Sequence, residues 1–157
     1  MNASVSWQKR LSFTGKADSG FEVPLGSDQE VGGDNDGFEP LELMAISLAG
    51  CTAMDVISIL TKKKQAVTTF EVKVHADRAE EFPKVFTRAV ITYLVTGHAV
   101  DETALLRSIE LSATKYCPAQ AMLGKVIPID LVYEIYEDEG GEKKRLVKQG
   151  KYTPTSV

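Results

Sequence analysis

One apolar segment, from Pro40 to Leu60, constrains the fold of this chain more than any other feature. Of its 21 residues 14 are apolar, and no proline interrupts it after the first position. Proline is favoured in the first turn of a helix, and lysines such as Lys62 suit the last turn. Its few polar residues do not gather on one face, and a helix that is apolar nearly all round is buried on most sides. The segment therefore predicts a long, buried central helix, whose complete burial in a chain of 157 residues calls for a partner chain.

The same segment is predicted not to cross a membrane. Glu42 and Asp55 interrupt it, and its longest uncharged stretch, residues 43–54, has 12 residues against the roughly 20 that a bilayer requires. The N-terminus has no apolar core of a signal peptide. We therefore expect a cytoplasmic protein with no membrane partner.

Length and charge indicate a single soluble globular domain over residues 1–157. The net charge is −4, and lysines and arginines are interspersed with acidic residues. Binding of nucleic acid through its phosphates needs a basic face, so no nucleic-acid partner is expected. Two cysteines are too few for a disulfide-dense secreted scaffold.

The remaining pattern predicts short strands and helices on both sides of the long helix. Alternation and turn residues predict an N-terminal hairpin of two strands, and Asp101 is a plausible N-cap for a helix that runs to about Tyr116. From Glu137 onward, 9 of 15 residues are charged, which predicts an extended tail over residues 137–157. Hairpins beside a separate helix layer predict an α+β fold with a mostly antiparallel sheet. The expected segments are strands at 5–13, 21–25, 70–76, 86–95 and 129–136, and a short helix at 119–126.

The two cysteines are the candidate reactive residues. Cys51 lies in the middle of the apolar helix, and Cys117 precedes Pro118, at or near the N-cap of a short helix. The free N–H groups and dipole of a helix N-terminus favour a thiolate, and Lys115 adds a positive charge nearby. Asp55, four residues after Cys51, suits the orientation of a hydrogen-bond partner. Free cysteines are also common as small buried hydrophobes, so a structural role stays open for both.

Other reactive sites find less support in the sequence. Zinc sites need closely spaced ligand pairs, whereas both cysteines, His75 and His98 stand singly. Residues 34–37 are rich in Asp but lack the glycine and glutamate of a calcium loop, which indicates a turn. Nothing in the pattern calls for a metal or a nucleotide cofactor.

With both cysteines placed, the chain resembles the OsmC/Ohr family. The segments that carry the resemblance are EPLELMAISLAGCTAMDVISIL around Cys51 and LSATKYCPAQAML around Cys117. The segment ADRAEEFPKVFTRAVITYLVTG between them is similar to a less-characterised OsmC-like subgroup. The resemblance implies an intertwined homodimer and thiol peroxidase chemistry with an oxidative or osmotic stress role. Cys51 would attack an organic hydroperoxide, Cys117 would resolve the sulfenic acid to a disulfide, and an external dithiol or lipoyl-type reductant would reopen it.

Three charged residues would support the thiol peroxidase chemistry that the resemblance implies. The hydroperoxide-reductase branch has a glutamate directly after the proline, where this chain has Leu41 and carries the acid at Glu42. That branch also uses an arginine of the N-terminal hairpin to lower the thiol pKa, for which Lys16 or Arg10 would stand in. These departures leave a second function open, a non-catalytic dimer that binds a small hydrophobic ligand. For either function, the apolar helix surface around Leu48, Met44 and Met54 is the expected binding surface.

Overall fold

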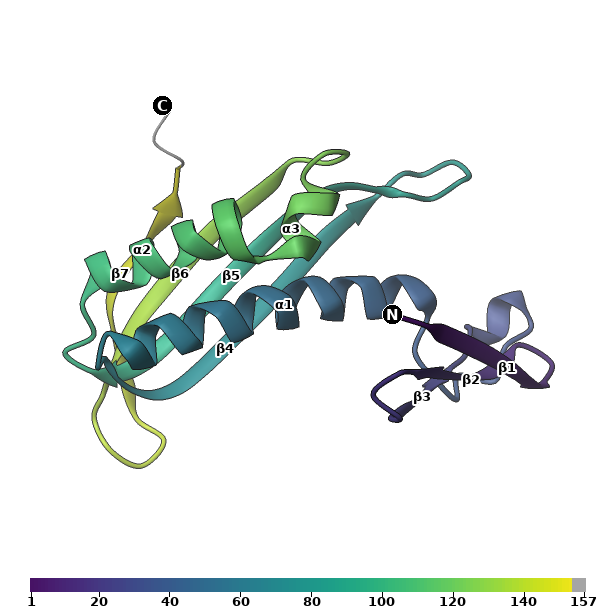
Figure 1. Ribbon diagram of the computed structural model, residues 1–157, viewed down its shortest axis with the longest axis horizontal. Coiled ribbons are helices and arrows are strands. Elements are labelled where there is room, and N and C mark those ends of the chain that lie inside the picture. Colours follow the sequence, from purple (N-terminus) through teal and green to yellow (C-terminus); the bar gives the residue numbers. More distant parts are fainter. Residues whose placement is uncertain (154–157) are drawn as a thin grey trace. The chain divides into compact units, whose positions relative to one another are not determined.

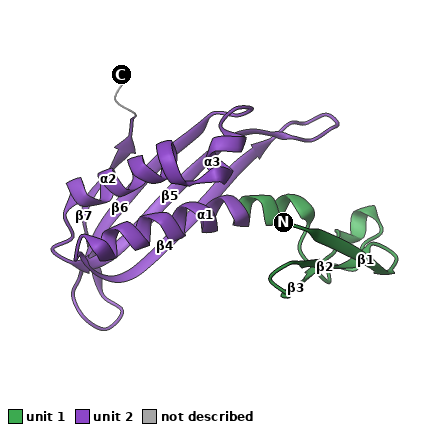
Figure 2. Cartoon of the chain, viewed as in Figure 1, with its two compact units in different colours: residues 1–45 green, residues 46–157 purple. Residues whose placement is uncertain are grey.

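The computed structural model describes residues 1–153, which divide into two compact units, one over Met1–Ala45 and one that begins at Ile46 (Figure 2). The boundary lies inside helix α1 (Pro40–Lys62). This helix begins and ends as the sequence predicted, with Pro40 in its first turn and Lys62 in its last. The expectation of one domain over residues 1–157 stays a prediction.

The first unit contains a three-stranded antiparallel sheet in the order β1-β2-β3. The prediction of two strands here is wrong, because a turn at Arg10 divides the first of them. Arg10 takes a left-handed backbone conformation (φ 44°), which is unfavourable for a residue with a side chain. Its guanidinium offsets that cost by binding Asp34 and the carbonyl of Gly32. The elements are β1 (Ala3–Lys9), β2 (Ser12–Ala17), β3 (Glu22–Leu25) and the 3-10 helix η1 (Gln29–Val31).

The second unit is a four-stranded sheet in the order β4-β5-β6-β7, with helices over one of its faces (Figure 1). Neighbouring strands are antiparallel except β5 and β6, which are parallel. Parallel neighbours need a crossover, and the helices between β5 and β6 supply it. The predicted α+β class with a mostly antiparallel sheet is confirmed. The elements are β4 (Ala66–Arg78), β5 (Phe86–His98), α2 (Glu102–Leu111), the π-helical turn η2 (Ser112–Tyr116), α3 (Pro118–Leu123), β6 (Ile129–Asp138) and β7 (Lys144–Tyr152).

The core of the second unit lies between this sheet and the helices. Every second residue of β5 is buried from Ala89 to Val95, as expected for a strand with one covered face. Helix α1 buries Leu48, Thr52, Val56 and Leu60, which are spaced four apart and form one stripe. The sequence predicted burial on most sides, but within one chain only this stripe is covered. The other apolar side chains of α1 are partly covered or exposed.

The apolar character of α1 also corrects the membrane argument. By length and composition, it is the one helix of residues 1–153 that is long and apolar enough to cross a membrane. A helix with one or two charged residues can still be apolar enough to cross a membrane, so the length of the longest uncharged stretch does not exclude α1. Its stripe of buried residues packs in the protein core, however, and Asp55 on the same helix binds Ser112.

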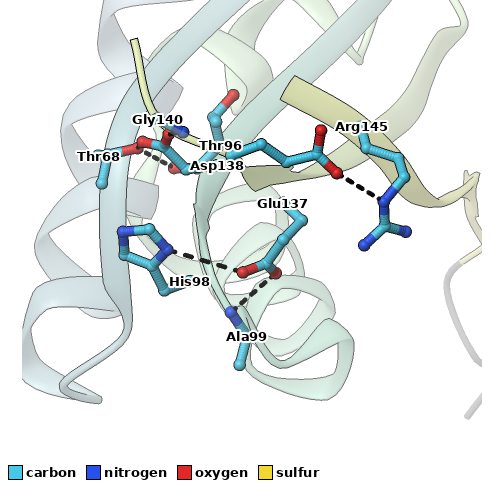
Figure 3. Close-up of polar contacts among 9 residues, drawn as sticks. Thr68, Thr96, His98, Ala99, Glu137, Asp138, Gly140 and Arg145 are labelled. Carbon is cyan, nitrogen blue, oxygen red and sulfur yellow. Dashed lines mark hydrogen bonds and ion pairs between the residues drawn. The ribbon is translucent and has the colours of Figure 1, made fainter. Parts of the chain in front are cut away.

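The charged segment after Glu137 is not a tail through Tyr152, because it forms strand β7 against β6. Figure 3 shows the hydrogen bonds of Glu137 and Asp138 with residues of neighbouring segments. Charged side chains suit an exposed edge strand, so high charge here did not mean lack of structure. The carboxylate of Asp138 accepts hydrogen bonds from Thr68 Oγ1 at 2.6 Å and from the Gly140 N–H at 2.9 Å. Glu137 accepts from the N–H of Ala99 at 3.1 Å. The part of the predicted tail at 154–157 lies outside the described residues.

Candidate functional site

The two cysteines come together although they are distant in sequence. Cys51 is half-buried in the middle of α1, whereas Cys117 is only 2% exposed at the N-cap of α3. Both are free thiols. The pKa of Cys117 is raised to about 11, mainly by burial and in addition by a side-chain hydrogen bond with Cys51 and by the charge of Cys51. Each thiol therefore lies within the electrostatic reach of the other.

The N-cap position of Cys117 is confirmed, but its expected effect on ionisation is not. Sγ of Cys117 accepts a hydrogen bond from the N–H of Gln120 at 3.4 Å, and this N–H and that of Ala119 lower the pKa. Desolvation outweighs both, so Cys117 is protonated at neutral pH. Lys115, which was expected to add positive charge, lies over the ring of Tyr116 at 5.3 Å.

A chain of buried hydroxyl groups lies beside the cysteines. Thr52 Oγ1 lies 2.7 Å from the hydroxyl oxygen of Tyr93 and 2.9 Å from Oγ of Ser112. Ser112 in turn donates to Oδ2 of Asp55 at 2.9 Å. The orienting role expected for Asp55 stays a prediction. Burial is the main reason that the pKa of Tyr93 is raised to about 12, and the charges of Cys117 and Asp55 raise it further.

Sequence reasoning missed Tyr93, Thr52 and Ser112 as site residues. Two signals in the sequence pointed to them in part. Tyr93 occupies an inward position in the alternation of β5, and Thr52 follows the buried Leu48 by four residues. A polar group on a buried face needs a partner, but the partners come from different elements and are not visible in the sequence.

Gln120 connects the cysteine to this hydroxyl chain. Its backbone N–H holds Sγ of Cys117, while its side-chain amide lies close enough to the Tyr93 hydroxyl to lower the pKa of that tyrosine. The side chain is 6% exposed, and its Nε2 has no hydrogen-bond partner of good geometry among residues 1–153. A buried donor without a partner is costly, so the amide is available to an oxygen atom that enters this space.

The three charged residues of the predicted site lie in the first unit, where each has a local partner. Arg10 donates to Asp34 Oδ1 at 2.7 Å, and Lys16 pairs with Glu22 at 3.3 Å. Glu42 accepts from the N–H of Glu39 at 2.9 Å, which caps the first turn of α1. The roles of Arg10, Lys16 and Glu42 toward Cys51 stay predictions.

The predicted apolar binding surface needs one correction. Leu48 is 2% exposed and belongs to the core, whereas Met44 and Met54 are 44% and 69% exposed. A separate apolar cavity of about 440 Å³ lies within the first unit. It is lined by Val5, Leu11, Phe13, Leu25, Gly26, Ser27 and Pro40.

The two histidines lie in exposed ion-pair positions, as expected for surface residues. His75 Nε2 lies 3.1 Å from Asp77, and His98 Nδ1 lies 3.6 Å from Glu137. Within residues 1–153, no three His, Cys, Asp or Glu side chains gather in a group that could hold a metal ion.

Comparison with known proteins found a matching family, related sequences and similar structures. Residues 33–132 match the family described as OsmC-like protein. Protein YhfA of Escherichia coli strain K12 is 37% identical over 135 residues, which cover 86% of this chain and 98% of that protein. A hypothetical protein from Aquifex aeolicus VF5 has a similar structure, with a TM-score of 0.76, 28% identity and coverage of 88% of this chain and 97% of the other.

A more distant structure shares the fold. It is an organic hydroperoxide resistance protein OsmC from Legionella pneumophila, with a TM-score of 0.63 and 15% identity. The match covers 85% of this chain and 94% of the other. At that identity the likeness shows a common fold alone.

Proposed function

The chain belongs to the OsmC-like family. We propose that it is a cysteine-based peroxidase that reduces organic hydroperoxides and also hydrogen peroxide. Family membership and neighbours named for organic hydroperoxide resistance support a role in peroxide stress. The observation that carries the proposal is the electrostatic contact of Cys51 with Cys117, two thiols from separate elements in one partly buried place. We place this activity in the cytoplasm.

The proposed cycle uses the two sulfur atoms in turn. The Cys51 thiolate attacks the terminal oxygen of the hydroperoxide, so that an S–O bond forms, the O–O bond breaks and an alcohol leaves. Cys117 then attacks the sulfur of the resulting sulfenic acid, which forms the disulfide and releases water. An external dithiol, of the lipoyl type, reduces the disulfide by thiol exchange. No metal or nucleotide takes part. The different exposure of the two thiols suits this order, because Cys51 is more accessible than Cys117.

The test is turnover of cumene hydroperoxide with a dithiol reductant. Cys51→Ser is expected to abolish turnover, because no sulfur remains to attack the peroxide. Cys117→Ser is the matched control, since it is expected to reduce about one equivalent of peroxide and to stop at the sulfenic acid, which a dimedone adduct on Cys51 reports. Unchanged turnover in Cys51→Ser contradicts the proposal.

We propose that Arg10 or Lys16 activates Cys51, with Glu42 as the orienting acid. A cation lowers the pKa of a neighbouring thiol, and arginine does so with a better geometry than lysine. Arg10→Met and Lys16→Met are compared for the rate of Cys51 oxidation at pH 7. If Arg10 or Lys16 supplies the activating charge, the variant without that charge is expected to show slower oxidation of Cys51. The other variant is expected to match wild type.

We further propose that the protein is a homodimer. Helix α1 exposes the apolar side chains of Met44, Ile46 and Met54 by 44 to 69%, and so much exposed apolar surface on one helix is unusual for a monomer. Ile46→Glu and Met54→Glu are expected to shift the mass in multi-angle light scattering toward one chain. Ser58→Glu, at an exposed polar position of the same helix, is the control and is expected to leave the mass unchanged.

A second function is favoured by the apolar cavity of the first unit. Its volume of about 440 Å³ suits a small hydrophobic ligand, which the protein would bind without catalysis. Thiol titration before and after one equivalent of peroxide separates the two functions. A peroxidase loses both thiols together, whereas a binding protein keeps them.

A further inference from the structure

The buried hydroxyl chain has a definite direction. Ser112 donates its only hydroxyl proton to Asp55, so its oxygen must accept from Thr52. Thr52 has then used its own proton, so its oxygen must accept from the hydroxyl of Tyr93. The acceptor Asp55 at one end therefore fixes the direction of every hydrogen bond in the chain. The oxygen of Tyr93 is left with only its lone pairs to offer at the other end.

The hydroxyl chain lies close to Cys117, whose N–H donates to the backbone carbonyl of Ser112 at 2.9 Å. Cys117 and Asp55 both act electrostatically on Tyr93, and Gln120 contacts the Tyr93 hydroxyl through its side chain and Sγ of Cys117 through its backbone. Nε2 of Gln120 has no hydrogen bond of good geometry among residues 1–153, and it can hold an oxygen atom near the Tyr93 hydroxyl. The oxygen end of the hydroxyl chain, a buried amide donor and a protonated thiol thus share one buried region.

We propose that the chain Tyr93–Thr52–Ser112–Asp55 is a proton relay that accepts the proton of Cys117 when this thiol forms the disulfide with Cys51. This inference rests on the proposed peroxidase function and adds residues to its second step. A thiol that is buried and protonated must lose its proton to become a nucleophile. The relay gives it a path to an acid at the edge of the core, because Asp55 is half-buried rather than buried.

The sulfur of Cys117 attacks the sulfur of the Cys51 sulfenic acid, the S–S bond forms and the S–O bond breaks. The proton of Cys117 passes to the oxygen of Tyr93, while each hydroxyl proton of the chain moves one place and the last reaches Asp55. The leaving hydroxide takes up a proton from solvent and becomes water, and Nε2 of Gln120 is placed to hold its oxygen.

The experiment measures the two steps separately in single turnovers of the full-length protein. Formation of the Cys51 sulfenic acid is followed by dimedone trapping after rapid mixing with cumene hydroperoxide, and disulfide formation by the loss of both thiols. Thr52→Val keeps the shape of the side chain but removes its hydroxyl. It is expected to leave the rate of sulfenic acid formation within about twofold of wild type and to slow disulfide formation at least about tenfold. This loss is modest compared with what proton transfer by a positioned side chain contributes to catalysis.

Two further variants keep the test decisive. Thr52→Ser retains the hydroxyl and is expected to restore disulfide formation to within about twofold of wild type, which a purely structural role for the threonine methyl group would not do. Asp55→Asn removes the terminal acceptor at a half-buried position, and is expected to slow the same step even if Thr52→Val fails to fold. Its folding is checked by circular dichroism.

The outcomes separate the relay from the proposed function. Normal sulfenic acid formation with wild-type disulfide formation in Thr52→Val and in Asp55→Asn overturns the relay alone. Absence of any sulfenic acid on Cys51 in the wild-type protein overturns the peroxidase function, and the relay with it.

Discussion

The hydroxyl oxygen of Tyr93 lies 2.7 Å from Oγ1 of Thr52, although the two residues are 41 positions apart in the chain. This contact joins the central strand β5 to the long helix α1 directly beside Cys51. The buried hydroxyl groups of this network do not destabilise the core, because each of them has a hydrogen-bond partner.

Tyr93→Phe is expected to cost about 1 kcal/mol of unfolding free energy at pH 7, because Thr52 loses its donor. The pKa of Tyr93 is raised to about 12 in the fold, from 10.0. The stability due to neutral Tyr93 is therefore fully present below pH 10 and is lost as the pH rises toward 12. Urea unfolding should show the difference between the two proteins narrowing over this range. Parallel pH profiles would contradict the prediction.

Alkylation of Cys117 by iodoacetamide is expected to rise with a midpoint near pH 11, since burial raises the pKa of this thiol to about 11 from 9.0. Cys51→Ala removes a neighbour that raises this pKa, so the midpoint should move down. Mass spectrometry of the Cys117 peptide gives the rate at each pH, with circular dichroism to confirm the fold. A midpoint near 9 in wild type, or no movement in Cys51→Ala, would refute this.

Gly97→Ala is expected to destabilise the protein by about 1–3 kcal/mol, because overpacking forces the backbone to shift. A Cβ at Gly97 would lie 2.2 Å from the carbonyl oxygen of Ala66. Gly50→Ala is the matched control on α1, where a Cβ meets nothing within 4 Å. Alanine in the helix should increase the stability by about 0.5–1 kcal/mol. Thermal unfolding of both variants tests the contrast, and an equal effect would count against it.

Asp130→Asn is expected to lower the melting temperature at pH 7. Hydrogen bonds from Lys151 and Arg88 lower the pKa of Asp130 below its ordinary 3.8. This contribution is present above pH 3.8 and is lost as the pH falls through the lower value in the fold, so the two proteins should converge in acid. Glu71→Gln, which removes the exposed pair with Lys73, is the control and should change little. A constant difference down to pH 2 would argue against the role of Asp130.

Local chemistry made several features predictable. The start of α1 at Pro40, the N-cap at Cys117 and the inward alternation of β5 depend on neighbours along the chain, and the structure agrees with them. The errors arose where distant residues decide. Arg10 takes a turn conformation that Asp34 stabilises, and the charged segment 144–152 becomes a strand because β6 offers a partner.

For the candidate site, the amino-acid pattern was enough to place both cysteines in helical settings, one within an apolar helix and one before a proline. Their interaction, the burial that keeps Cys117 protonated, and the contacts of Thr52, Tyr93 and Ser112 with Asp55 come from the folded chain. Ionisation and hydrogen bonding depend on desolvation and on contacts within a few ångström. Those contacts arise between residues that the chain itself keeps tens of positions apart.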